Sequence, residues 1–300
     1  MDENLELKEI KKRLEKNFDS YWTRITGIVD DYETENGIKI KKDNKAEIKK
    51  LKQLIKDWEE EIEEYCDEIR EYFNLEYFDE TDVMVYEYQE FKDNIFAEVL
   101  WTVSSALRNA AFDEEMVRYR ESFLRTSAAD IFMVVKNILT KTRDYINNYV
   151  TNINYNRINK IEHLKVEFLT EEEMLLSGVI GYGIRSEILH RLYPGHFGMM
   201  TRRSIWAMYY FSNEAEEFIT DEKSVDDKKQ RTSHDWEYDY LRFLFYQNFI
   251  ANLLEAKLNK YNISIKRNFR FGYVNLFLNQ IYYLHKEEID VLYKWQSARM

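Results

Sequence analysis

Residues 177–213 read SGVIGYGIRSEILHRLYPGHFGMMTRRSIWAMYYFSN, and this stretch holds five of the eight glycines and the only proline of the 300-residue chain. Glycine permits backbone angles and close approaches that other residues resist, and proline stops a helix. The pattern predicts two short helices, over residues 184–192 and 202–211, joined by a tight turn after Pro194. Four arginines against one acid surround that turn. We therefore expect this stretch to present the main functional surface.

The rest of the chain is acidic, poor in glycine and helical in its pattern. One proline and eight glycines are too few for the many turns of a sandwich or barrel, so we predict an all-α fold. Hydrophobic residues make up 45% of the chain and aromatic residues 16%, enough for a bulky core. The net charge of −12 argues against a protein that binds nucleic acid over its whole surface, but it allows a local basic patch.

Apolar residues recur at steps of three and four along residues 4–34 and again along residues 45–73. This alternation is typical of a coiled-coil seam. It predicts a long N-terminal antiparallel coiled-coil hairpin over residues 1–75, an arm about 45 Å long at about 1.5 Å per residue. The arm would grip another protein subunit or a second copy; alternatively, the two helices pack flat on the body. The predicted partner-binding residues are Leu7, Ile10, Leu14, Ile25, Ile48, Leu51, Ile55, Trp58 and Ile62.

Residues 76–300 are predicted to form a multi-helix body. Periodicity and capping residues predict its helices, and residues 220–235, charged and poor in apolar side chains, read as a linker. The predicted helices of the body, besides the two of the central stretch, span residues 81–108, 114–124, 127–149, 236–261, 273–284 and 286–298.

Arg185 and His190 are separated by four residues on one predicted helix. The pair resembles the R-x4-6-H motif of HEPN-type ribonucleases, which are themselves all-α. The resemblance implies a metal-independent ribonuclease, in which the histidine moves the 2′-hydroxyl proton and the arginine stabilises the anionic phosphorane. Arg191 and His196 match the same spacing across Pro194, so the motif arises readily. The structural alternative is that Arg185 and His190 anchor helix ends or pair with acids.

Residues 184–211 carry a second pattern, L-H-x-L-Y-P-x-x-F followed by an arginine. It resembles a recurring segment of uncharacterised helical proteins of bacterial genomes, some of them from phage-defence loci. The resemblance implies a defence setting but no reaction. It also implies that one compact unit is formed by Leu189, His190, Leu192, Tyr193, Pro194, Phe197 and Arg203.

Residues 256–286 contain no acid, and their basic residues are interleaved with aromatic ones. Such a pattern suits a surface that contacts a nucleic-acid backbone and stacks on bases. The alternative is that these bases neutralise the acids of this chain or face an acidic partner. Together with the central arginines, the predicted nucleic-acid-binding residues are Arg185, Arg191, Arg202, Arg203, Lys257, Lys260, Lys266, Arg267 and Arg270.

Motifs for a phosphate loop, a nucleophile elbow and a dinucleotide site are absent. Glu187 and His190 have the spacing of half a helical di-iron site, but there is no second copy, so we predict no metal and no cofactor. A single cysteine, Cys66, allows no internal disulfide and suits a reducing cytoplasm. No apolar run approaches the ~18 residues of a membrane span. We therefore expect a cytoplasmic protein that is not in a membrane.

Three hypotheses for function follow from these patterns. The leading one is a non-enzymatic helical scaffold or adaptor subunit of a bacterial multi-protein assembly, placed in anti-phage defence by the second resemblance and able to contact nucleic acid through a basic face. The alternatives are a HEPN-like ribonuclease that uses Arg185 and His190, and a stand-alone nucleic-acid-binding module.

Overall fold

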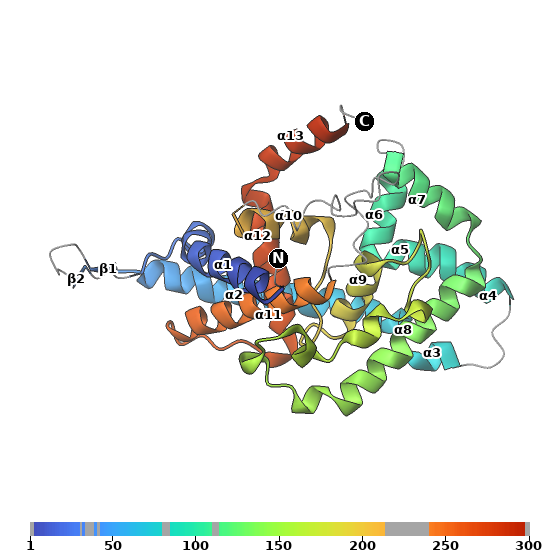
Figure 1. Ribbon diagram of the computed structural model, residues 1–300, viewed down its shortest axis with the longest axis horizontal. Helices are drawn as coiled ribbons and strands as arrows, with labels where there is room; N and C mark the ends of the chain where they lie inside the picture. Colours follow the sequence, from blue (N-terminus) through green and yellow to red (C-terminus); the bar gives the residue numbers. More distant parts are fainter. Residues whose placement is uncertain are drawn as a thin grey trace.

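The computed structural model describes residues 3–30, 32–33, 39–40, 43–79, 85–109, 114–213 and 240–297. Helices make up most of these residues, which confirms the all-α prediction (Figure 1). The described strands are two short ones, β1 (Tyr32–Glu33) and β2 (Lys39–Ile40), which pair antiparallel between the first two helices. Among the described helices, none is both long and apolar enough to cross a bilayer. The predicted linker at residues 220–235 lies outside the described residues.

The first helix, α1 (Glu3–Thr26), is shorter than the predicted span of residues 4–34. Gly27 ends it in the left-handed conformation, with φ of 73°. The N–H of Gly27 donates to the Thr23 carbonyl at 2.8 Å, as in a left-handed helix cap. The second long helix, α2 (Lys45–Tyr72), agrees with its prediction.

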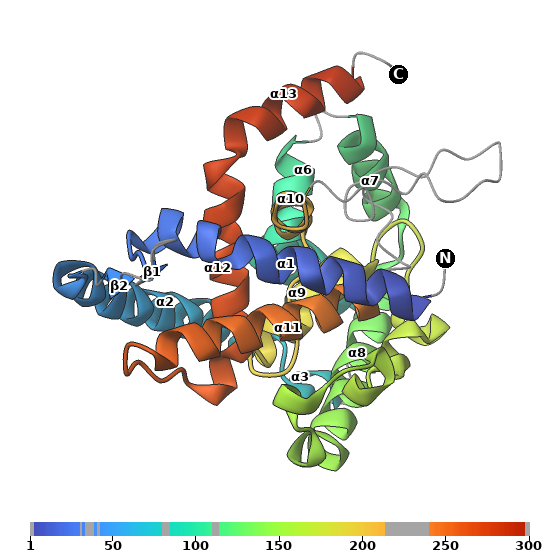
Figure 2. The ribbon, with the colours of Figure 1, turned by 60° about the vertical axis from the view of Figure 1, so that its left-hand side comes forward.

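α1 and α2 do not form a projecting arm in this structure, so the coiled-coil hairpin is not confirmed. α1 lies against α10 (Arg202–Phe211), α11 (Tyr240–Asn259) and α12 (Arg270–Leu284), and α2 lies against α9 (Tyr182–Leu192) and α12 (Figure 2). Seven of the nine predicted partner-binding residues are buried, and Ile25 and Ile48 are half-buried against the same core. These nine side chains are therefore part of the chain's own core. The body covers the apolar stripe of α1 and α2 that the sequence analysis assigned to a partner.

Polar contacts also tie the N-terminal helices to the body. Lys257 of α11 bridges Asp19 and Asp30 at 2.6 Å each. Tyr273 of α12 donates its hydroxyl hydrogen to Glu59 of α2 at 2.6 Å. These contacts join segments more than 200 residues apart in the sequence.

Between α2 and the central stretch, two of the predicted helices are confirmed and one is broken. α7 (Glu114–Arg125) and α8 (Ala128–Asn148) confirm their predicted spans. The span predicted as one helix over 81–108 is broken at Leu100, whose backbone is extended. Here the chain forms α4 (Val85–Glu90), a π-helical turn (Phe91–Phe96), α5 (Ala97–Val99) and α6 (Trp101–Asn109), preceded by α3 (Leu75–Asp79).

Short 3-10 turns connect α8 to the central stretch, and the last helices follow their predictions closely. The turns are Val150–Asn152, Tyr155–Arg157, Ile161–Leu164, Glu167–Thr170 and Glu172–Met174; another, Arg267–Phe269, precedes α12, and α13 (Lys286–Ser297) ends the described chain.

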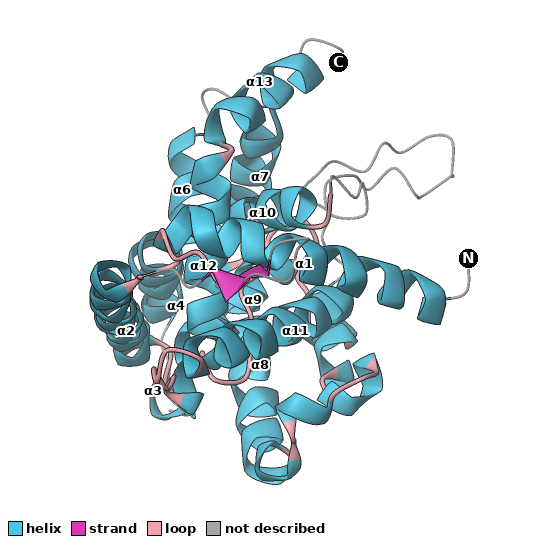
Figure 3. Cartoon of the chain, turned by 90° about the vertical axis from the view of Figure 1, so that its left-hand side faces the viewer, coloured by secondary structure: helices cyan, strands magenta, loops and turns pink. Residues whose placement is uncertain are grey.

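The helix α9 lies at the centre of the bundle (Figure 3), where it packs against α2 and α6. All of its residues are buried, including five with polar or charged side chains: Arg185, Ser186, Glu187, His190 and Arg191. The sequence predicts a functional surface here, but the structure places the helix inside the core. Its polar groups must therefore find their partners within the protein, since a buried polar group without a partner is costly.

We predict that Leu14→Ala lowers the free energy of unfolding by about 2–5 kcal/mol, because Leu14 is fully buried between α1 and the body. Equilibrium urea unfolding followed by tryptophan fluorescence measures the change. Lys12→Ala, at an exposed position on the same helix, is the control, with an expected change of about 0.5 kcal/mol or less. A separate, earlier transition for α1 and α2 that leaves the rest of the unfolding curve unchanged would contradict this packing.

Candidate functional site

Glu187 of α9 caps the N-terminus of α6. Its two carboxylate oxygens accept hydrogen bonds from the backbone N–H groups of Trp101 at 2.6 Å and Thr102 at 2.8 Å. A carboxylate in this position satisfies N–H groups that the helix leaves open and interacts favourably with the helix dipole. The cap comes from 86 residues further along the chain. This distance explains why the local sequence around Leu100 predicts an uninterrupted helix.

Arg191, one turn after Glu187, joins α9 to α2 and α5. Its guanidinium donates to the carbonyls of Val99 at 2.8 Å and Tyr65 at 3.0 Å, and it pairs with Glu68 and, at 3.4 Å, with Glu187. Burial raises the pKa of the Glu187 carboxyl above its ordinary value, while its N–H donors and Arg191 oppose that shift. Glu187 and Arg191 therefore form a buried ion pair in which each partner satisfies the other.

His190 is sealed in the core. Its Nδ1 lies 2.8 Å from the Phe197 carbonyl, which can only accept, so Nδ1 carries the hydrogen. Nε2 then accepts from the Tyr65 hydroxyl at 2.9 Å. Burial lowers the pKa of His190 to about 4, so the ring is neutral at pH 7.

Arg185 is buried in a different environment from His190. Its guanidinium donates to the Leu169 carbonyl at 2.6 Å and lies 4.0 Å from the centre of the Tyr182 ring. Arg185 and His190 are 1% and 0% exposed, and neither lines the cleft described below. The geometry therefore presents neither residue of the predicted ribonuclease pair to an RNA phosphate.

The nine predicted nucleic-acid-binding residues do not gather on one exposed face. Four of them, Arg185, Arg191, Lys257 and Arg270, are buried. Exposed Lys266 pairs with Glu59 and Glu63 at 3.0 Å each, and Lys260 lies 3.8 Å from Asp30. Much of the basic set therefore neutralises acids of this chain, as the alternative interpretation expects. The remaining three residues are exposed Arg267, half-buried Arg202 and half-buried Arg203.

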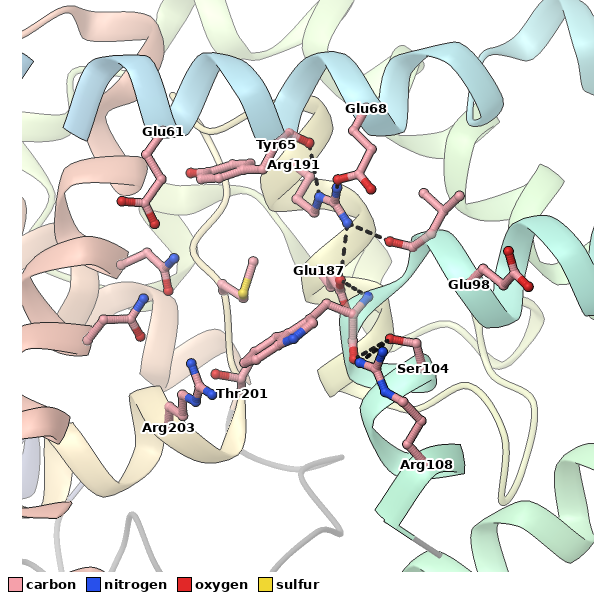
Figure 4. Close-up of a pocket in the computed structure, with 15 residues that line it drawn as sticks. Glu61, Tyr65, Glu68, Glu98, Ser104, Arg108, Glu187, Arg191, Thr201 and Arg203 are labelled. Carbon is pink, nitrogen blue, oxygen red and sulfur yellow. Dashed lines mark hydrogen bonds and ion pairs between the residues drawn. The ribbon is translucent and has the colours of Figure 1, made fainter. Parts of the chain in front are cut away.

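A cleft of about 440 Å³ opens beside the Glu187–Arg191 pair, at the meeting of α2, α5, α6, α9, α10 and α12 (Figure 4). Its volume lies within the range of small-molecule sites, about 300–1,000 Å³. Most of the residues that line it are polar or charged, and they come from segments far apart in the sequence. The lining residues are Glu61, Tyr65, Glu68, Glu98, Val99, Trp101, Ser104, Arg108, Glu187, Arg191, Met199, Thr201, Arg203, Asn275 and Asn279.

Two of the four arginines in residues 177–213 line this cleft, Arg191 and Arg203. Arg191 is buried, whereas Arg203 is half-buried. Its guanidinium lies 4.4 Å from the centre of the Trp101 ring and 5.8 Å from those of Tyr282 and Tyr283. One N–H group donates to the Tyr283 hydroxyl at 3.2 Å. Stacking on aromatic rings fixes a guanidinium while its other donors remain at the edge of the plane.

The sequence did not single out the asparagines of the cleft. Asn275 and Asn279 lie one turn apart in the run VNLFLNQI of α12, whose other residues are apolar except for Gln280. Two amides on one face of a largely apolar helix were the signal in the sequence that could have pointed to a binding site. The residues that face them across the cleft are known only from the folded structure.

No protein-family model, no curated protein and no solved structure matches the chain.

We predict that the protein loses stability as the pH falls from 6.5 toward 4. Folded His190, with its pKa lowered to about 4, stays neutral while the unfolded chain takes up a proton. The stability contributed by the neutral ring is complete above pH 6.5, and the loss is on the order of 3 kcal/mol at 1.36 kcal/mol per pKa unit. Urea midpoints at a series of pH values measure it. Burial also lowers the pKa of His196 to about 4, so His190→Gln should remove only its own part of the slope, and His163→Gln, at an exposed site, should remove none. The same slope in His190→Gln and the unaltered chain would contradict the prediction.

We predict that Arg191→Met lowers the free energy of unfolding by about 3–5 kcal/mol, because it leaves the Glu187 carboxylate buried without its cation. Adding Glu187→Gln should recover part of the loss, since a neutral amide needs no counter-charge. Chemical denaturation of the two single variants and the double variant gives the coupling energy. Simple additivity of the two changes would show that the pair is not a unit.

Proposed function

We propose that the protein is a non-enzymatic helical adaptor subunit of a multi-protein assembly, and that its partner docks on the end formed by α13 and the last turn of α12. The main support is α13, which projects from the bundle (Figures 1 and 2). Of its residues 286–292, only Ile289 is buried. Exposed apolar side chains at this end are Tyr283, Leu284, Val291 and Leu292.

The length of α13 supports this proposal. α13 has 12 residues, and helices of this length are marginally stable in water unless an apolar face packs on something. Val291 is 53% exposed. A partner that covers Val291 and Leu292 would supply the packing that the described part of this chain does not.

Charge narrows the chemistry of the partner. The exposed acids Glu287, Glu288 and Asp290 lie beside the apolar residues of α13. Oppositely charged surfaces attract across an interface and suppress wrong partners. The partner we propose is therefore another protein with an apolar strip flanked by basic residues. A second copy is disfavoured, because this chain carries a net charge of −12.

The biological setting is also a proposal. The resemblance of residues 184–211 to proteins of phage-defence loci supports a bacterial anti-phage assembly. The ribonuclease hypothesis gains no support, because Arg185 and His190 are buried. The nucleic-acid hypothesis gains little, because four of its nine residues are buried.

We predict that the protein co-purifies in fixed stoichiometry with a partner when it is expressed in its native host with its neighbouring genes. Val291→Asp combined with Leu292→Asp should abolish the complex, since both changes place charge on the apolar face of α13. Met133→Asp, which alters an exposed apolar residue of α8, should retain it. Native mass spectrometry measures the stoichiometry, and circular dichroism checks that each variant is folded. A protein that elutes alone, or a complex that survives the double change, contradicts the proposed adaptor function.

A further inference from the structure

One wall of the cleft carries amide groups that no described residue satisfies. Asn275 and Asn279 of α12 are four residues apart, so their side chains lie on the same face. Asn275 is only 5% exposed, and neither side chain forms a hydrogen bond within the described part of the protein. The Asn275 amide therefore forms no hydrogen bond that holds the fold together, and it reaches the cleft, where it is available to a bound molecule.

Opposite charges flank these amides along α12. Near its start, Gly272 lies against α2, where a Cβ would come within 2.7 Å of the Ile62 Cδ1 atom, and Glu61 is the neighbour of Ile62. At its other end, Tyr283 accepts a hydrogen bond from Arg203 of α10. Gly272 and Tyr283 are about 16 Å apart at about 1.5 Å per residue. Asn275 and Asn279 lie between them.

Glu61 and Arg203 extend into the cleft from these two ends (Figure 4). Glu61 forms no ion pair with any described residue, and Arg203 has none with a described acid. Glu68 and Glu187, by contrast, are paired with Arg191. The groups along this wall without an ion-pair partner among the described residues are therefore one carboxylate, two amides and one guanidinium, in that order.

This order selects for a ligand with charges of both signs. A simple anion would be attracted by Arg203 but repelled by Glu61, and a simple cation would meet the reverse. Side-chain amides can donate and accept, so they complement peptide and carboxylate groups alike. Trp101, which is 40% exposed, offers an apolar surface beside Arg203.

We propose that this cleft binds a zwitterion of the amino-acid class, as a free amino acid or a short peptide. The ammonium group of the ligand pairs with Glu61, and its carboxylate pairs with Arg203. In a short peptide, Asn275 and Asn279 form hydrogen bonds with the peptide groups between these ends; in a free amino acid, they share its ammonium and carboxylate with Glu61 and Arg203. Tyr283 borders both this site and the docking surface, but the four residues that bind the ligand lie outside that surface, so the site stands whether or not the proposed adaptor function holds.

The test uses the full-length protein in a thermal-shift screen with the common free L-amino acids and the glycyl dipeptides made from them. We expect at least one of these probes to raise Tm, and isothermal titration then gives its Kd. Dipeptides that bind more tightly than their free amino acids identify a peptide site, and the reverse identifies an amino-acid site. For the best probe, N-acetylation or conversion of the carboxylate to an amide should each weaken binding about tenfold or more, about 1.4 kcal/mol.

Variants separate this site from general effects on the fold. Arg203→Ala and Asn275→Ala should each weaken the best probe about tenfold or more, whereas Arg267→Ala, at an exposed arginine outside the cleft, should not. Asn275→Ala should also leave Tm without ligand unchanged, because its amide has no partner to lose. If this variant does not fold, Asn279→Ala, which is half-buried, replaces it. The Val291→Asp, Leu292→Asp chain should bind the probe normally.

Three results would overturn the proposal. The first is that no zwitterion in the screen raises Tm. The second is that an N-acetylated probe or inorganic pyrophosphate binds as tightly as the parent zwitterion, which would assign a plain anion site to Arg203. The third is that Arg203→Ala binds the probe normally.

Discussion

The buried pair of Glu187 and Arg191 is the constraint on which the rest of the structure depends. Both side chains lie on a helix whose residues are all buried, so their polar groups need internal partners. Glu187 finds the first N–H groups of α6, and Arg191 finds carbonyl groups of α2 and α5. These hydrogen bonds fix α2, α5 and α6 around α9. It also places the cleft, because the same two residues form part of its lining.

Burial of α9 also explains the role of the N-terminal helices. A helix without an exposed face needs covering on every side, and α2 supplies one side through Tyr65 and Glu68. α1 covers α10, α11 and α12 in turn. The basic residues near the C-terminus then hold the acidic N-terminal helices in place, Lys257 through Asp19 and Lys266 through Glu59. A chain with a large acidic excess thus uses much of its positive charge internally.

The sequence predicts where most helices begin and end, but it does not predict which elements pack against them. Pro194 and the nearby glycines bound α9 and α10 locally, so both were predictable within about two residues. The 3-4 period of α1 and α2 was real, but an apolar stripe reads the same whether a partner helix or the body covers it. The break at Leu100 depends on Glu187, and the end of α1 on the left-handed conformation of Gly27. Among the cleft residues, Arg203, Arg191 and Glu187 lie in residues 177–213, the stretch predicted to be functional. Trp101, Asn275 and Glu61 did not, because nothing near them in the sequence shows what they face.

The central claim is that α1, α2 and the body form one unit around the buried helix α9. Native-state hydrogen exchange tests it most directly, because amides that open only by global unfolding share one free energy of exchange. The expected result is that the buried turns of α1 and α2, around Leu14 and Ile62, exchange as slowly as α9. Rapid exchange throughout α1 and α2, with α9 still protected, would contradict the claim and restore the projecting arm.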